Sequence, residues 1–258
     1  MARTISVIGL EKIGLVKPGD DVALLILDAL KIEGQELMDG DVVVVSQKIV
    51  SKADGLLVDV SSLKPSRRAI SISKRTKKDP RLVELILRDS RKVLRADPQA
   101  VIVERKDGFV CLNAGVDKSN VRGRTVYSRL PEDSDESAKE LRIRLEKMSG
   151  RRIAVIVADT YSRPLRVGQV ELAIGISGIE PIVDYRGHED LFGYELRYKF
   201  VALADEIAAA AELVMGQGTE QVPVAILRGL TRLIRNESEG SSRKLLLGRR
   251  RDLFSKIL

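Results

Sequence analysis

The hydrophobic and polar positions of the chain form two kinds of pattern, and each predicts a different element. Nearly continuous apolar runs predict buried strands, because a strand covered on both faces carries no polar alternation. The strands predicted in this way lie at residues 39–47, 151–164 and 222–229. Apolar residues at helical spacing predict amphipathic helices. These helices lie at residues 22–34, 131–150 and 203–216.

Turn and cap residues extend this assignment. Residues 4–10 are rich in β-branched side chains and predict a short strand, whereas 100–115 predict a hairpin around Lys-Asp-Gly. A helix is predicted over 79–95, with Asp79 as N-cap and Pro80 at its first position. Strands and helices alternate irregularly, so the predicted class is α/β (α+β), with mixed, partly antiparallel sheets.

Composition narrows the class of protein. The chain has 258 residues, 44% of them apolar, which suits one large domain or two small ones. No run of eighteen apolar residues and no signal-peptide layout occur, so we expect a cytoplasmic protein without a membrane partner. A single cysteine, Cys111, excludes an internal disulfide, and a single histidine, His188, argues against a His-rich metal site.

The net charge of +7 leaves two interpretations open. It describes either a solvated surface or a protein that binds an anion, such as a nucleotide, a nucleic acid or a polyacid substrate. Only 3% of the residues are aromatic, so stacking platforms for single strands are scarce. Aromatic scarcity argues against a nucleic-acid partner.

Two short stretches carry oxygen ligands next to predicted strands. Asp159 and Thr160 follow an apolar run and could hold Mg²⁺ or Mn²⁺, but the same residue types also cap helices and turns. Asp117 could likewise bind a metal and Asn120 a ligand, or both could form an Asx-turn after a strand. From these stretches alone, the cap and turn interpretations are favoured.

Basic and glycine-containing segments are candidates for holding an anion. Lys48 and Lys52 share a face if residues 46–55 are helical, and Arg163 closely follows Asp159. The loop at 215–223 could wrap a nucleotide with backbone amides, with the Gln217 carbonyl reaching a metal, or could be a helix C-cap. No P-loop or complete dinucleotide-binding glycine motif occurs, so neither type of nucleotide site is expected.

Six segments resemble, in order and spacing, the coenzyme F420-0:L-glutamate ligases. They are VVSQKIVSKADG, DPRLVELILRDS, GFVCLNAGVDKSNV, VADTYSRPLRVGQVELAIG, DYRGHEDLFGYEL and ADEIAAAAELVMGQ with VPVAILRG, and the closing RRRDLF is also similar. The resemblance implies a family-specific ligase fold, with residues 1–258 as one catalytic unit of two interwoven subdomains, and a homodimer. It implies GTP- and metal-dependent addition of L-glutamate to F420-0 through an acyl phosphate, first by an α- and then by a γ-linkage.

The resemblance also implies site residues and cofactors. Two Mg²⁺ or Mn²⁺ ions are expected, GTP is the co-substrate, and K⁺ is a further candidate ion. The implied metal ligands are Asp117, Asp159, Thr160 and Gln217. The implied catalytic residues are Asp117, Asp159, Lys48 and Arg163. The implied nucleotide contacts are Gly9, Leu10, Glu11, Lys12, Ser46, Gln47, Lys48, Ser51, Asn120, Met215, Gly216, Gln217, Gly218, Thr219, Glu220, Gln221 and Val222. A related amide ligase acting on another acid and a basic nucleic-acid-binding protein remain the alternatives.

Overall fold

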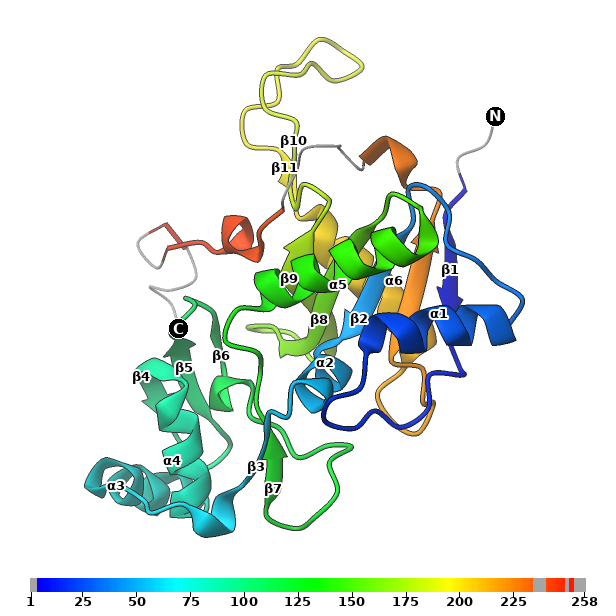
Figure 1. The fold of residues 1–258 in the computed structure, drawn as a ribbon. Helices are drawn as coiled ribbons and strands as arrows, with labels where there is room; N and C mark the ends of the chain where they lie inside the picture. Colours follow the sequence, from blue (N-terminus) through cyan, green and yellow to red (C-terminus); the bar gives the residue numbers. More distant parts are fainter. Residues whose placement is uncertain (1–3, 234–239, 249–250, 253–258) are drawn as a thin grey trace.

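A five-stranded mixed sheet forms the centre of the protein (Figure 1). The computed structural model describes residues 4–233, 240–248 and 251–252. The sheet order is β1 (Ser6–Gly9), β12 (Val224–Arg228), β2 (Val42–Ser46), β8 (Ala154–Ser162) and β9 (Gln169–Ser177). Only β2 and β8 run parallel, and the other neighbours are antiparallel. The predicted mixed α/β class is confirmed.

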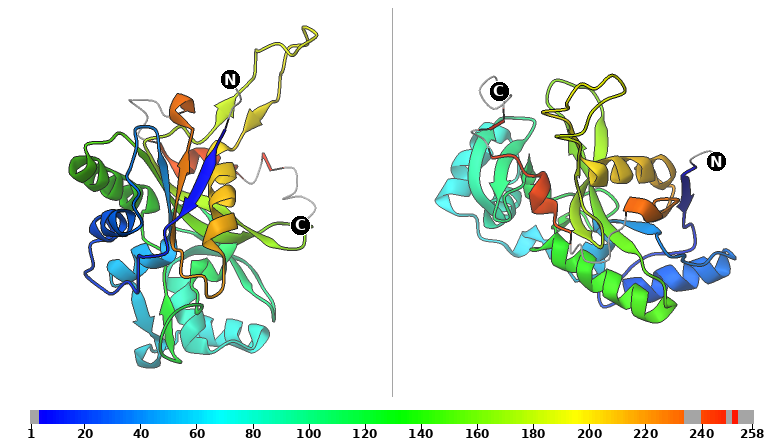
Figure 2. Two further views of the ribbon diagram at one scale, coloured as in Figure 1. Left: turned by 90° about the vertical axis from the view of Figure 1, so that its right-hand side faces the viewer. Right: turned by 90° about the horizontal axis from the view of Figure 1, so that it is seen from above.

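Helices cover both faces of this sheet (Figure 2). One face carries α1 (Val22–Ile32) and α5 (Ser134–Ser149), and the other carries α6 (Leu203–Met215). Val43 and Val45 belong to the first core, whereas Val42 and Val44 belong to the second. This double burial explains why β2 is apolar at every position and shows no alternation.

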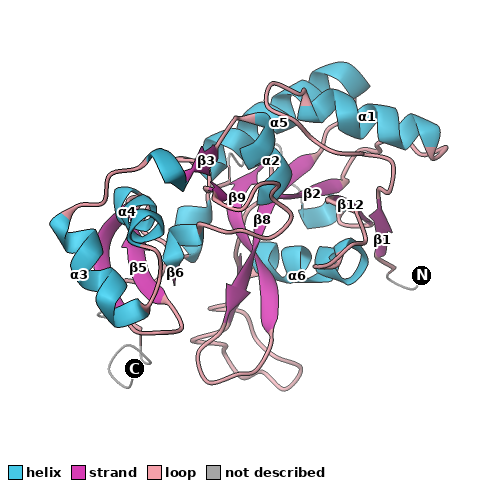
Figure 3. Cartoon of the chain, turned by 90° about the horizontal axis from the view of Figure 1, so that it is seen from below, coloured by secondary structure: helices cyan, strands magenta, loops and turns pink. Residues whose placement is uncertain are grey.

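A smaller unit with its own core lies beside the sheet (Figure 3). Its helices α3 (Arg67–Thr76) and α4 (Pro80–Arg88) pack on the antiparallel strands β4 (Ser90–Ala96), β5 (Val101–Arg105) and β6 (Val110–Leu112). A two-stranded pairing of β3 (Leu57–Asp59) with β7 (Val126–Ser128) lies where the chain enters and leaves this unit. The division into two interwoven subdomains stays a prediction.

The remaining elements are short. Helix α2 (Gln47–Ala53) follows β2 directly, and β10 (Val183–Asp184) pairs with β11 (Phe200–Val201). Single 3₁₀ turns occur at Val60–Ser62, Asn113–Gly115, Thr231–Leu233 and Ser242–Leu245. None of the described helices combines the length and the apolar character that a membrane span requires. Of the closing RRRDLF, only Arg251 and Asp252 fall within the described residues.

The helix predicted over residues 79–95 is wrong in its second half. Asp79 caps α4 as predicted, but the helix ends at Arg88 and the chain continues as β4. Val93 pairs with Val103, and Ala96 pairs with Val101. Sequence pattern alone could not show this, because the strand is specified by pairing with a partner further along the chain and not by local helix propensity.

The strand predicted over residues 151–164 is confirmed as β8, and it runs past Asp159 to Ser162. It forms a long antiparallel ladder with β9, in which Thr160 faces Glu171. The parallel pairing with β2 nevertheless stops at Ser46 and Ala158, so Asp159 is the first residue beyond it. A register shift at Val157/Ala158 adds a bulge at this point, a feature that commonly re-aims side chains beside functional sites.

Candidate active site

Two groups of polar side chains meet beyond the carboxyl end of the parallel β2–β8 pair. Helix α2 begins there with Gln47 and Lys48, capped by the Ser46 hydroxyl, which accepts from the Lys48 amide at 3.3 Å. Asp159 and Thr160 continue along β8 at the same edge. Open α/β sheets bind ligands outside the carboxyl ends of their parallel strands, so this edge is the candidate site.

The first group is built on an ion pair between α2 and the loop after β6. The Lys48 ammonium contacts Asp117 Oδ2 and lies 3.2 Å from the Ser119 hydroxyl, and the lysine side chain is only 13% exposed. Burial opposes the charge of Asp117, but hydrogen bonds from Lys48 and Ser119 prevail and hold its pKa below the usual value. Asp117 is therefore ionised and faces a cation.

Asp117 also shapes the loop that carries it. Its Oδ1 accepts from the backbone amides of Lys118 at 2.6 Å and Ser119 at 3.0 Å, so the Asx-turn expected here is present. The preceding Gly115 has φ 72°, and a Cβ there would lie 2.3 Å from Leu130 Cδ1. Only glycine fits this position. One carboxylate oxygen thus holds the turn and the other faces the site, so the two interpretations of Asp117 do not exclude each other.

The carboxyl of Asp159 interacts electrostatically with Lys48 and Asp117. Burial raises the pKa of its carboxyl to about 6; the nearby Lys48 charge and a hydrogen bond from Gln47 lower it, and Asp117 raises it. Two carboxylates and one ammonium thus share one partly buried space. Like-charged carboxylates in such a space favour a bound cation, because it compensates both charges.

The second group joins β8, β9 and the loop after α6. The Thr160 hydroxyl lies 3.0 Å from Glu171 Oε1 and 3.0 Å from Gln217 Oε1. The Gln217 amide nitrogen donates to Glu171 Oε1 at 2.8 Å and to Glu212 Oε1 at 2.9 Å. Burial, with Asp159 adding to it, raises the pKa of Glu171 to about 7.

Glu171 and Glu212 were not predicted from the sequence. A signal existed for Glu171, because it is the one charged residue of residues 169–177. In the structure it is only 5% exposed. Its partners could not be identified without the register of the β8–β9 ladder, which pairs it with Thr160. Glu212 comes directly after Ala211, a buried residue of α6, and nothing in its sequence context distinguished it from an ordinary polar helix position.

The predicted nucleotide segments 9–12 and 215–222 lie next to each other. A Cβ on Gly9 would come within 2.8 Å of Val222 Cγ1. The loop after α6 is closed by Glu220 Oε2, which accepts from the Gly218 amide at 2.7 Å. The Leu10 side chain is fully buried in the core, so Leu10 can offer a ligand only its backbone.

The predicted contacts on α2 are largely buried. Gln47 is 2% exposed and Ser51 0%, and the Ser51 hydroxyl donates to Gln47 Oε1 at 3.0 Å. Asn120 and Arg163 have no hydrogen bond or ion pair with the acids described above. Asn120 is exposed with φ 52°, and the Arg163 guanidinium donates to Val167 O at 3.4 Å in the β8–β9 loop. Their predicted roles stay predictions.

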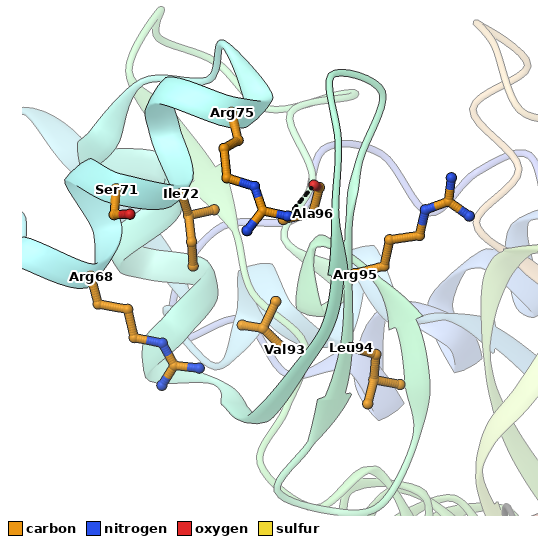
Figure 4. Close-up of a pocket in the computed structure, with 8 residues that line it drawn as sticks. All are labelled: Arg68, Ser71, Ile72, Arg75, Val93, Leu94, Arg95 and Ala96. Atoms are coloured by element: carbon orange, nitrogen blue, oxygen red, sulfur yellow. Dashed lines mark hydrogen bonds between the residues drawn. The ribbon is translucent and has the colours of Figure 1, made fainter.

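A second charged region lies away from this edge, between α3 and β4 (Figure 4). Its cavity of about 290 Å³ is lined by residues of one face of α3 and by the backbone and side chains of β4. The lining residues are Arg68, Ser71, Ile72, Arg75, Val93, Leu94, Arg95 and Ala96. No acid lines it, and the Arg75 guanidinium donates to Ala96 O at 3.1 Å. The site chemistry described above does not extend to it.

The donor set at the sheet edge suits a divalent cation that keeps water or phosphate ligands. Among the described residues, no group of three or more His, Cys, Asp or Glu side chains could hold a metal by itself. Asp117 and Asp159 contribute carboxylates, and Thr160 and Gln217 contribute neutral oxygens. Glu171 Oε2 is buried without a hydrogen-bond partner. Such partial oxygen sets fit Mg²⁺ or Mn²⁺, which bind substrate phosphates as well as protein.

Comparison with known proteins assigns the chain to a family. The profile of the F420-0:Gamma-glutamyl ligase family matches residues 11–229. The chain is 45% identical to the coenzyme F420:L-glutamate ligase of Methanothermobacter thermautotrophicus, over 97% of this chain and 98% of the relative. It is 46% identical to the enzyme of that name from Methanopyrus kandleri, over 93% of both, and 40% identical to that of Methanocaldococcus jannaschii, over 98% and 97%. The chain therefore belongs to the F420-0:gamma-glutamyl ligase family.

Proposed function

We propose that this protein is a coenzyme F420:L-glutamate ligase that uses GTP and divalent metal to add L-glutamate to F420-0, by an α-linkage and then by a γ-linkage. The observation that carries the proposal is the convergence of Lys48, Asp117, Asp159, Thr160 and Gln217 at one edge of the sheet. These five residues come from segments far apart in the sequence. Their oxygen and ammonium groups match the needs of phosphoryl transfer, which depends on positioning and charge neutralisation.

The proposed reaction begins at the free carboxylate of F420-0. A carboxylate is a poor electrophile, so one of its oxygens attacks the γ-phosphorus of GTP, the bond to the β-phosphate oxygen breaks, and GDP leaves. The uncharged amine of glutamate then attacks the acyl carbon, phosphate leaves, and the amine nitrogen loses a proton to give the amide. Lys48 is proposed to neutralise phosphate charge, and its ammonium contacts Asp117 Oδ2 within the site.

Metal binding is assigned to the two groups of oxygen ligands. Asp117 and Asp159 would hold one ion, and Thr160 and Gln217 a second. Bound Mg²⁺ or Mn²⁺ would supply charge stabilisation for the transferring phosphoryl group; K⁺ is a further candidate ion. No protein nucleophile is required, which agrees with the chemistry of Cys111: burial raises the pKa of its thiol to about 12. A nucleophilic thiolate is therefore not available there.

The nucleotide is proposed to lie against segments 9–12 and 215–222. Their closeness at Gly9 and Val222 supports a shared backbone surface. Gly216, with φ 65°, ends α6 and turns the chain into the loop that follows. Backbone amides following such a turn are common phosphate contacts. Ser46, Gln47, Lys48, Ser51 and Asn120 complete the proposed nucleotide contacts, and Arg163 is proposed as a catalytic residue.

A homodimer is proposed from the arm that projects from β10 and β11 (Figure 1). Residues 185–199 extend away from the sheet, and Leu191 is 96% and Phe192 94% exposed near the arm's tip. Large exposed apolar side chains gathered in this way mark interaction surfaces. Replacing both with serine is expected to give a monomer in light scattering coupled to gel filtration, whereas an unchanged dimer would exclude the arm as the contact.

The ligase assay tests the function directly. The protein is incubated with F420-0, L-glutamate, GTP and Mn²⁺ or Mg²⁺, and the products are separated and weighed by mass spectrometry. The expected products are GDP, phosphate and F420 species heavier by one and then two glutamate residues. Omission of GTP, or chelation of the metal, should stop the reaction. Product absent with every metal, or formed without GTP, overturns the proposal.

A further inference from the structure

We propose that Glu171 is a ligand of the cation held by Thr160 and Gln217, and that Glu212 orients the Gln217 amide for this role. This inference rests on the proposed function, because it places a third oxygen ligand in the second metal position. It concerns two residues that neither the sequence pattern nor the resemblance identified.

The first argument is the orientation of the Gln217 amide. Its nitrogen has two N–H groups, and these donate to Glu171 Oε1 and Glu212 Oε1 at 2.8 and 2.9 Å. Both donors are therefore in use, and the carbonyl oxygen is left on the side of Thr160, 3.0 Å from its hydroxyl. The Gln217 carbonyl oxygen and the Thr160 hydroxyl that donates to it thus lie side by side, as two ligands of one hard cation must.

The second argument is an asymmetry between the two glutamates. Glu212 is fully occupied, since its Oε1 accepts from Gln217 and its Oε2 accepts from the Glu171 backbone amide at 3.0 Å. Glu171 uses only Oε1, whereas its Oε2 is buried and has no hydrogen-bond partner. A buried carboxylate oxygen without a partner costs free energy, so its retention points to a ligand.

The negative charges around Glu171 also favour a bound cation. Glu171 is 5% exposed and lies near the carboxylates of Asp159 and Glu212. Within the described part of the chain, no lysine or arginine forms an ion pair with Glu171 or Glu212, while Lys48 is engaged with Asp117. Threonine and glutamine oxygens are neutral, so they cannot balance a divalent ion. The Glu171 carboxylate supplies this charge, and the ion in turn compensates the buried acids.

The division of roles gives different expectations for the two residues. A ligand lost from the metal weakens binding more than a lost orienting partner, whose removal typically costs about 10- to 100-fold in affinity. We therefore expect Glu171→Gln to weaken the second ion by at least about 100-fold and Glu212→Gln by about tenfold. Glu206→Gln is the matched control, because Glu206 is exposed on the first turn of the same helix as Glu212.

The experiment counts bound Mn²⁺ by electron paramagnetic resonance and calorimetry, with a non-hydrolysable GTP analogue present. Wild-type protein and Glu206→Gln are expected to bind two Mn²⁺ per chain. Glu171→Gln should bind one, and its thermal midpoint should no longer rise with the second equivalent of Mn²⁺. Glu171→Asp keeps the charge but withdraws it by one methylene, and it serves the same test if the glutamine variant does not fold.

The outcomes separate this inference from the function on which it rests. Two tightly bound Mn²⁺ in Glu171→Gln or Glu171→Asp, or only one in the wild type, overturns the role of Glu171 while ligase activity can persist. GTP-dependent product absent from the wild type overturns the function instead. Equal weakening by Glu171→Gln and Glu212→Gln would contradict the assignment of ligand and orienting residue.

Discussion

The site at the edge of the sheet and the cavity between α3 and β4 are both rich in charge, but they differ in sign, burial and pairing. The site holds four carboxylates and one lysine, and hydrogen bonds through Gln217 join the carboxylates of β9 and α6. The cavity gathers exposed arginines without an acid in its lining. Exposed arginines such as these chiefly set the surface potential, whereas the buried, hydrogen-bonded acids of the site can act on a bound ligand.

The excess positive charge of the chain is located in one segment, away from the site. Residues 60–78 hold seven lysines and arginines and no acidic residue, which equals the net charge of +7 of the whole chain. The rest of the molecule, including the site, is balanced. The high pI therefore describes α3 and its surroundings, and it gives no information on the ligand of the active site. Variants of the site should accordingly lower catalysis, whereas variants of the cavity should change only the binding of the protein surface to anions.

The largest effect is expected from Asp159→Ala. Loss of this carboxylate removes a proposed metal ligand, and several kcal/mol of charge stabilisation correspond to a fall in kcat of at least about 1,000-fold. The fold should persist, because burial raises the pKa of this carboxyl, so the folded state disfavours its charged form. Steady-state rates and circular dichroism melting check both parts. Near-wild-type turnover would return Asp159 to a structural role.

Lys48→Met is expected to lower turnover by about 100-fold, as for removal of one donor aimed at developing charge. The matched control is Lys52→Met, since Lys52 lies four residues further on the same helix but pairs with none of the site acids. Its turnover should stay within about threefold of wild type. Equal losses in the two variants would mean that α2 contributes general positive charge and not a specific contact.

Gly216→Ala should act on nucleotide binding and less on chemistry. Gly216 has φ 65° and ψ 179°, a conformation that costs a side chain about 1–3 kcal/mol, and a Cβ would lie 2.4 Å from Glu220 Cδ. The KM for GTP should rise about tenfold, since 1.4 kcal/mol is one decade. Gly150→Ala is the control, because Gly150 ends α5 with φ 69° and nothing lies within 4 Å of its Cβ, so the KM for GTP should not change. A KM unchanged in Gly216→Ala would remove this loop from the nucleotide site.

The smallest effect on catalysis is expected from Arg68→Gln with Arg75→Gln. Both residues lie on one exposed face of α3, so ligase activity and the melting midpoint should stay close to wild type. Elution from a phosphocellulose column should shift to lower salt, because two of the seven excess charges are gone. A loss of activity of tenfold or more would show that this region takes part in the reaction, and the comparison would fail.

Local patterns predicted much of the fold, because its main elements are specified locally. Apolar runs identified β2, β8 and β12, and the buried stripe identified α6. The error came where a partner distant in sequence decides the structure, as in β4, which pairs with β5. The end-of-strand argument singled out Asp159 and Thr160, and the parallel pairing of β2 with β8 does end at Ala158, just before them.

The candidate site was only partly predictable for the same reason. Single stretches could not decide between a turn and a ligand for Asp117, and in the structure its two oxygens serve the turn and the ion pair separately. Glu171 and Glu212 required the hairpin register and the packing of α6, neither of which one sequence provides. The sequence therefore singled out polar residues near strand and helix ends, and the structure was needed to find the glutamates that hydrogen-bond with them.

Anomalous diffraction from crystals grown with Mn²⁺ and a non-hydrolysable GTP analogue tests the central claim most directly, because it locates each ion without reference to activity. The account predicts two Mn²⁺ peaks at the carboxyl end of β2 and β8, one on Asp117 and Asp159 and one on Thr160, Gln217 and Glu171, with the terminal phosphate of the analogue between them. Peaks elsewhere on the protein, or nucleotide bound at this edge without any Mn²⁺, would contradict it.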